Sequence, residues 1–90
     1  MTAAELIKKL NLLPHPEGGF YRETYRSEQK VTYNNKTRNA GTAIYFLLKD
    51  MEISHFHRVS SDELWLFHEG KTIDIYVINK SGELNIKSLG

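Results

Sequence analysis

The chain has 90 residues, of which 40% are hydrophobic and 26% charged, and its formal net charge is +1. A chain of this length forms at most one small domain, so we expect residues 1–90 to fold as a single domain. Acidic and basic residues are scattered and nearly balanced, which gives no electrostatic reason to expect nucleic acid or a membrane as a partner. Cysteine is absent, and no apolar stretch is long enough to span a membrane. These features exclude disulfides and cysteine chemistry, and they predict a soluble cytoplasmic protein.

The first predicted element is a short helix near the N-terminus. Thr2 and Glu5 stand at the spacing of a capping box, and apolar residues follow at helical intervals. Pro14 and Pro16 come next and cannot continue a helix. The sequence therefore predicts one amphipathic helix over about residues 3–11.

From about residue 20 to residue 88 the sequence predicts β-strands joined by short polar connections. The strand segments are rich in β-branched and aromatic residues, and they cover residues 20–26, 42–48, 53–59, 62–68, 72–78 and 83–87. Residues 34–41 have no strong apolar anchor, so we expect a polar loop there. Strands of this length and spacing indicate an all-β antiparallel sandwich or barrel. These strands are fewer than the eight of a closed jelly roll, and the last one leaves an open edge. We therefore expect either a homodimer completed by strand exchange or a shortened chain.

Two histidines in one predicted strand form the most informative pattern in the chain. His55 and His57 share one face, because successive side chains on a strand alternate. A hairpin turning at residues 60–61 would bring the carboxylate of Glu63 toward the two imidazoles. Two imidazoles and one carboxylate are the donor set of a facial-triad metal site. The sequence therefore predicts His55, His57 and Glu63 as metal ligands.

Each of these residues also has an ordinary structural explanation. The two histidines could be hydrogen-bonded to backbone or carboxylate groups in a polar pocket. Glu63 could form an ion pair with Arg58 across the strands. Trp65 and Phe67 share the face of Glu63 in the predicted strand and would line a substrate pocket beside it, or they could be core residues.

A second pattern follows the paired glycines of the segment His15 to Gly19. In the predicted strand over residues 20–26, Arg22 and Arg26 share one face, and tyrosines, including Tyr21, lie on the other. An arginine can hold a carboxylate or phosphate by two parallel hydrogen bonds, so Arg22 is a predicted substrate-binding residue. The alternative is an edge strand whose arginines pair with surface glutamates, which we favour for Arg26.

The histidine pattern resembles the first motif of the cupin superfamily, which is a glycine, five residues, His-x-His, three to five residues, a glutamate, six residues and a glycine. His55, His57, Glu63 and Gly70 match its core, whereas Lys49 stands at the position of the leading glycine. With the segments of residues 15–19, 21–26 and 61–65 added, the chain resembles the uncharacterised cupin-5 subfamily, which is similar in fold to the RmlC-type keto-sugar epimerases.

This resemblance implies a jelly-roll β-barrel, usually dimeric, with a pocket inside the barrel. In metal-binding cupins the residues that match His55, His57 and Glu63 are ligands, and the metal is expected to be iron, manganese, nickel or zinc. A further histidine comes from a second motif that this chain lacks. We therefore expect the N-terminal part of a cupin, with an incomplete barrel behind one short N-terminal helix.

Three functions are consistent with these residues. The leading hypothesis is a cupin that binds a small molecule and holds a metal through two histidines and one glutamate. The second is a metal-free keto-sugar epimerase or isomerase, in which His55 or His57 removes a proton and Tyr21 returns one. The third is a module that senses a ligand without catalysis. The substrate does not follow from the sequence, because one barrel fold hosts many activities.

Overall fold

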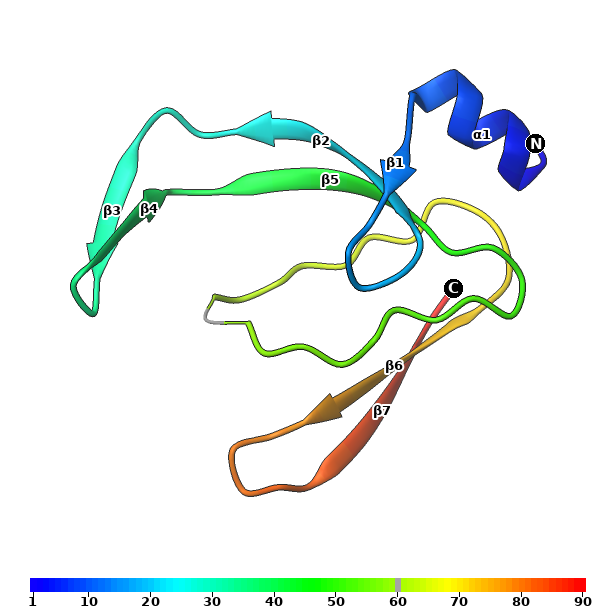
Figure 1. Cartoon of the computed structure of the whole chain (residues 1–90). Coiled ribbons are helices and arrows are strands. Elements are labelled where there is room, and N and C mark those ends of the chain that lie inside the picture. Colours follow the sequence, from blue (N-terminus) through cyan, green and yellow to red (C-terminus); the bar gives the residue numbers. More distant parts are fainter. Residues whose placement is uncertain (60) are drawn as a thin grey trace. The chain divides into compact units, whose positions relative to one another are not determined.

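The computed structural model describes residues 1–59 and 61–90 of the chain. It is built mostly of antiparallel strands behind one short N-terminal helix (Figure 1). The described elements are α1 (Ala3–Leu10), β1 (Leu13–Pro14), β2 (Phe20–Arg26), β3 (Lys30–Tyr33), β4 (Lys36–Asn39), β5 (Thr42–Leu47), β6 (Ile73–Ile78) and β7 (Leu84–Leu89). The chain divides into two compact units, Met1–Arg58 and Val59–Gly90, and each is described here by itself. Among the described residues, no helix is both long and apolar enough to cross a membrane.

The N-terminal helix begins with the predicted capping box. The N–H of Glu5 donates to Oγ1 of Thr2 over 3.1 Å, and the Glu5 carboxylate accepts from the Thr2 N–H over 3.3 Å. The helix ends at Leu10 because Asn11 adopts the left-handed conformation, with φ of 54°. Asparagine tolerates this conformation better than most residues, so it can end a helix. The predicted helix is confirmed, and it ends one residue earlier than expected.

The first unit contains a three-stranded antiparallel sheet in the order β1–β2–β5. Strands β2 and β5 pair in step as far as Glu23, which lies opposite Ile44, and pairing resumes with Tyr25 opposite Ala43. Thr24 is therefore an extra residue on β2, a β-bulge, and its hydroxyl donates to the carbonyl oxygen of Ala43 over 3.2 Å. Both strands were predicted from the sequence, but the bulge was not.

The bulge changes which side chains share a face of the sheet. Arg22 and Tyr25 lie opposite two β5 residues that are themselves two apart, so they point to the same face. Arg26 is the next residue and points to the other face, together with Tyr21. The prediction that Arg22 and Arg26 share a face is therefore wrong, because it assumed unbroken alternation along the strand.

The polar loop predicted over residues 34–41 is in large part a strand. Strands β3 and β4 form an antiparallel hairpin, with Lys30 opposite Asn39 and Tyr33 opposite Lys36. The turn consists of Asn34 and Asn35, with φ of 51° and 62°, which are the positive angles that a tight two-residue hairpin turn requires. The hairpin was missed because strand β4 is polar on both faces and so gives no hydrophobic alternation.

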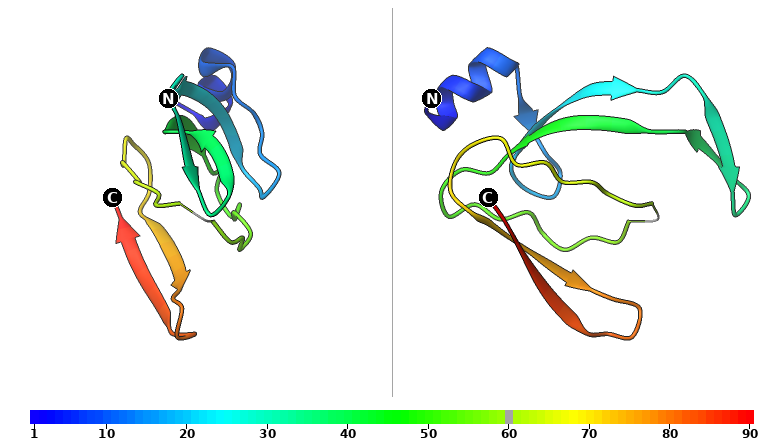
Figure 2. Two further views of the ribbon diagram at one scale, coloured as in Figure 1. Left: turned by 90° about the vertical axis from the view of Figure 1, so that its left-hand side faces the viewer. Right: turned by 180° about the vertical axis from the view of Figure 1, so that it is seen from behind.

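This hairpin continues the ribbon formed by β2 and β5. Backbone hydrogen bonds bridge the two ladders, from the Ser27 N–H to the Gly41 carbonyl oxygen over 2.8 Å and from the Ala40 N–H to that of Gln29 over 2.7 Å. The views in Figure 2 show β3 and β4 leading on from the ends of β2 and β5. One long two-stranded ribbon therefore runs over residues 20–47 of the first unit.

Residues 53–59 and 62–68, predicted as strands, belong to no β-ladder in the described part of the chain. Ser60, half of the predicted turn, lies outside the described residues. A strand is defined by the partner of its backbone groups, whereas β-propensity reports how side chains pack on a sheet. The strand prediction is wrong here because suitable side chains do not supply a backbone partner.

The second unit is built around a hairpin of β6 and β7, which the sequence predicts correctly. Ile73 lies opposite Leu89, and Ile78 lies opposite Leu84 at the turn. The Asn79 side chain stabilises this turn, because its Oδ1 accepts the backbone N–H groups of Ser81 over 3.0 Å and of Glu83 over 2.9 Å.

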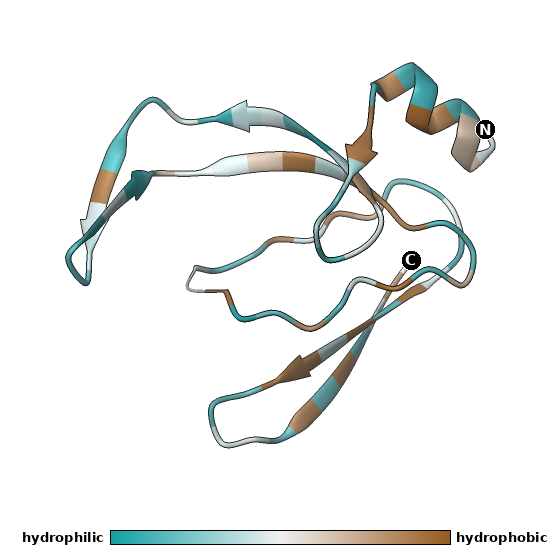
Figure 3. Cartoon of the chain, viewed as in Figure 1, coloured by the Kyte–Doolittle hydropathy of each residue, from teal (hydrophilic) through white to brown (hydrophobic). Residues whose placement is uncertain are grey.

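Large apolar side chains remain exposed on both units. Leu12 is the one buried hydrophobic side chain among the described residues, at 6% exposure. Figure 3 shows hydrophobic residues along β5, β6 and β7, and Ile44, Ile78 and Ile86 on these strands are all exposed. The β1–β2–β5 and β6–β7 sheets carry exposed apolar residues, and none of the three described sheets closes into a barrel.

Candidate functional site

The loop of residues 15–19 is tightly folded and precedes β2. The N–H of His15 donates to the carbonyl oxygen of Gly19 over 2.8 Å, and the N–H of Gly18 donates to that of His15 over 3.1 Å. The half-buried imidazole of His15 packs edge-on against the rings of Tyr21, with centroids 4.9 Å apart, and Phe46, at 5.3 Å. The loop therefore places His15 over the sheet face that carries Tyr21.

The hydrogen bonding of His15 defines which ring nitrogen carries its proton. The backbone N–H of Glu17 donates to Nδ1 of His15 over 3.0 Å. An imidazole nitrogen that accepts a hydrogen bond carries no proton, so in the neutral ring the proton is on Nε2. His15 is therefore a hydrogen-bond donor through Nε2 rather than a metal ligand. No role for this residue was predicted, although the paired glycines after it indicated a tight turn.

The same loop contacts the segment that carries the predicted histidine ligands. The N–H of His55 donates to the carbonyl oxygen of Glu17 over 2.7 Å. Gly18 has φ of 112°, and a Cβ atom at this position would overlap the carbonyl oxygen of Ile53. Only glycine fits this close approach, so the loop of residues 15–19 positions residues 53–55 without a β-ladder.

His57 is arranged as metal-binding histidines commonly are. Its Nδ1 lies 3.0 Å from the carbonyl oxygen of His55. A carbonyl oxygen only accepts hydrogen bonds, so Nδ1 carries the proton in this hydrogen bond, and in the neutral ring Nε2 has a free lone pair. A second-shell bond of this kind is usual in histidines that bind metal through the other nitrogen. Both His55 and His57 are exposed.

The other predicted site residues belong to the second unit. Glu63 is exposed, and Trp65 and Phe67 are each 37% exposed. Gly90 lies against the ring of Phe67, so this ring also has a packing role within the unit. Among residues 1–59 and 61–90, no three His, Asp or Glu side chains form a group that could hold a metal ion. The first unit thus presents His57 as a suitable donor, and the three-residue ligand set, whose Glu63 belongs to the second unit, stays a prediction.

The two arginines of β2 have different surroundings. Two nitrogens of the Arg26 guanidinium donate to the carboxylate of Glu23 over 2.6 and 3.1 Å, and a third donates to Oδ1 of Asn39 over 2.9 Å. The hydrogen bonds that Arg26 donates to the Glu23 carboxylate, reinforced by the negative charge of that carboxylate, raise the pKa of Arg26. The Asn39 amide in turn donates to the carbonyl oxygen of Ser27 over 2.6 Å. This bond links the β3–β4 hairpin to the end of β2. Arg26 therefore has the structural role that we favoured, whereas Arg22 takes no part in this network.

A strand-rich chain with one short N-terminal helix and a His-x-His segment is what the resemblance to the cupin superfamily predicts. The chain belongs to the Cupin_5 family, described as "Cupin superfamily (DUF985)", whose model matches residues 4–90. This finding confirms the resemblance that the sequence motifs indicated.

Two solved structures are similar to this chain. A protein from Shewanella oneidensis, known from an X-ray crystal structure, is 48% identical with a TM-score of 0.86. A hypothetical protein from Leishmania major is 39% identical with a TM-score of 0.93. Each comparison covers 100% of this chain but only 55% and 57% of the other, so the chain spans little more than half of either structure. A comparison with curated proteins finds no match. The described fold is therefore part of a cupin-type jelly roll, with the barrel incomplete.

Proposed function

We propose that this protein binds a small molecule in a cupin pocket and holds a divalent metal through His55, His57 and Glu63. Its membership of the cupin family supports a small-molecule-binding role. The choice of Glu63 comes from the spacing of the cupin motif, because the glutamate belongs to the second unit. Arg22, Trp65 and Phe67 stay candidates for contacts to the small molecule.

The main observation in support of metal binding is the 3.0 Å contact between Nδ1 of His57 and the carbonyl oxygen of His55. A neutral imidazole binds metal through an unprotonated nitrogen, and this contact leaves Nε2 of His57 in that state. His15 is a useful contrast, because its Nδ1 accepts a hydrogen bond and its Nε2 must carry the proton. The hydrogen bonding therefore favours His57 over His15 as a ligand.

A metal bound by two histidines and one carboxylate would supply Lewis acidity and open coordination positions. In this proposal the chain itself contributes three things. His57 is held in one tautomer by the backbone, Glu63 contributes a negative charge, and the loop of residues 15–19 positions the histidine segment through the bond between Glu17 and His55.

Calorimetric titration of chelator-stripped protein with Fe(II), Mn(II), Ni(II) and Zn(II) tests the proposal. We expect about one equivalent of metal to bind, and we expect His57→Ala and Glu63→Gln to weaken binding by at least about tenfold, because even outer-shell partners of a metal ligand are worth that much. His68→Ala is the matched control, since it removes a histidine that lies outside the proposed ligand set. Equal metal affinity in the parent protein and in His57→Ala would overturn the proposed site.

A further inference from the structure

One face of the β1–β2–β5 sheet carries an arginine that has no counter-ion among the described residues. Arg22 is exposed on β2, opposite Tyr45, and its guanidinium makes no ion pair or hydrogen bond with any other described residue. The bulge at Thr24 is the cause, because it turns Arg26 to the other face, where Glu23 neutralises it. On its side of the sheet, Arg22 therefore has no carboxylate partner in the described part of the chain. We name this side the Arg22 face.

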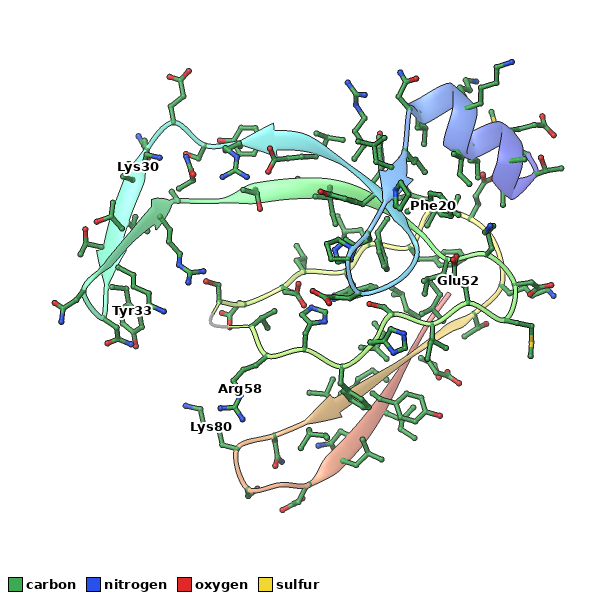
Figure 4. The ribbon with its side chains drawn as sticks, viewed as in Figure 1. Phe20, Lys30, Tyr33, Glu52, Arg58 and Lys80 are labelled. Carbon is green, nitrogen blue, oxygen red and sulfur yellow. The ribbon has the colours of Figure 1, made fainter. Side chains whose placement is uncertain are left out.

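A second cation lies on the same face. Nζ of Lys49 lies over the ring of Phe20, 5.0 Å from its centroid. Phe20 precedes Arg22 by two positions in the regular part of β2, so both side chains point to the Arg22 face. Two residues along a strand are separated by roughly 7 Å. Arg22 and Lys49 therefore both lie on the sheet face that carries Phe20, whose place at the beginning of β2 is marked in Figure 4.

No acidic residue opposes these two cations on the sheet. The strand residues of the Arg22 face are aromatic, aliphatic or basic, namely Phe20, Arg22, Tyr25, Ala43, Tyr45 and Leu47. Glu52 is close in sequence to Lys49, but its carboxylate accepts the Lys49 backbone N–H over 2.8 Å and so closes the turn. Lys49 itself forms no ion pair among the described residues. The Arg22 face thus combines two positive charges with exposed aromatic rings.

We infer that the Arg22 face binds the phosphate group of a small phosphorylated ligand. The planar guanidinium of Arg22 matches two phosphate oxygens with two parallel hydrogen bonds, and the ammonium of Lys49 supplies a second positive charge. A phosphate monoester carries roughly −1.5 to −2 charges at pH 7, so it neutralises both cations, whereas a carboxylate neutralises one. Tyr45, 42% exposed and opposite Arg22, offers a surface for a ring on the ligand. This inference rests on the proposed small-molecule binding through Arg22, and it shares no residue with the proposed metal site.

Titration with phenyl phosphate tests the inference. The protein is kept in a chelating buffer of low ionic strength, so that bound metal cannot contribute, and binding is followed by NMR of the arginine side-chain and backbone N–H groups. We expect saturable binding with shifts centred on Arg22 and Tyr45. Arg22→Gln should weaken binding by at least about tenfold, because a hydrogen bond to a charged group is typically worth that much. Arg22→Lys, which keeps the charge but loses the planar fork, should weaken it less.

Arg38→Gln is the matched control, because it removes the same charge from strand β4. If Arg22→Gln and Arg38→Gln weaken binding equally, the interaction is unspecific charge attraction and the site is overturned. Tighter binding of benzoate than of phenyl phosphate would overturn the assignment to phosphate. Absence of saturable binding would overturn the site itself. Since metal is excluded from the titration, none of these outcomes bears on the proposed metal ligands.

Discussion

Replacing Gly18 with alanine is expected to separate the loop of residues 15–19 from the histidine segment. The new Cβ atom would overlap the carbonyl oxygen of Ile53, which belongs to a backbone that cannot turn aside as a side chain can. The adjacent hydrogen bond between the His55 N–H and the Glu17 carbonyl oxygen, 2.7 Å long, would be lost as the two backbones move apart. The variant should therefore lose both stability and the position of His55.

The size of the effect follows from two contributions. A non-glycine residue held at φ of 112° occupies a sparsely populated conformation, which costs about 1–3 kcal/mol. The lost backbone hydrogen bond costs about 0.5–1.5 kcal/mol more. The total of about 1.5–4.5 kcal/mol corresponds to a fall in Tm of roughly 6–36 °C for a domain of this size. Thermal unfolding followed by circular dichroism measures this fall, and hydrogen exchange at the His55 amide measures the loss of its bond.

Two other glycine substitutions separate steric overlap from backbone strain. At Gly82, φ is 85° and a Cβ atom would have no neighbour within 4 Å, so Gly82→Ala carries only the strain, about 1–2 kcal/mol. At Gly41 a Cβ atom also meets nothing within 4 Å, and alanine there should be neutral or slightly stabilising. If Gly18→Ala is no more destabilising than Gly82→Ala, the contact with Ile53 is not the close one described and the reasoning fails.

Three further predictions concern the N-terminal half. Leu12→Ala should reduce the free energy of unfolding in urea by about 2–3 kcal/mol, because Leu12 is buried, and a loss near zero would contradict this. Asn39→Ala should reduce the free energy of unfolding by about 1 kcal/mol in the same assay, because it removes the hydrogen bond to Ser27. An unchanged free energy of unfolding would contradict a stabilising role for this bond. Hydrogen bonds from Thr2 lower the pKa of Glu5 from its ordinary value. They therefore stabilise the fold at pH values above the unfolded-state pKa, and this stabilisation is lost as the pH falls through the folded-state pKa. Thr2→Ala should raise that pKa in an NMR titration, and an unchanged value would refute the capping box.

Elements specified by neighbouring residues were predictable. The helix follows from the reciprocal bonds of Thr2 and Glu5, which lie three residues apart in one turn. Strands β2, β5, β6 and β7 follow from their apolar and β-branched composition. The cupin family follows from the spacing of His55, His57 and Glu63 within one motif, and the family comparison confirms it.

Features that depend on a partner far along the chain were not predictable. The bulge at Thr24 exists only because β5 pairs with β2 out of step beyond Glu23, and nothing in the sequence of β2 marks that position. The polar hairpin of β3 and β4 lacks the hydrophobic alternation by which strands are recognised. The segments 53–59 and 62–68 have strand-like side chains, but in the described structure they have no ladder partner.

The sequence by itself therefore determined the helix, most strands and the family, and it predicted His55 and His57 as candidate donors. The tertiary structure decided which nitrogen of His57 is hydrogen-bonded to the backbone and which β2 arginine has no counter-ion among the described residues. The physical reason is the range of the interactions. Capping bonds and side-chain alternation act over two to four residues, which a sequence displays directly. Strand register, bulges and tautomers are set by backbone groups that meet only after the chain has folded.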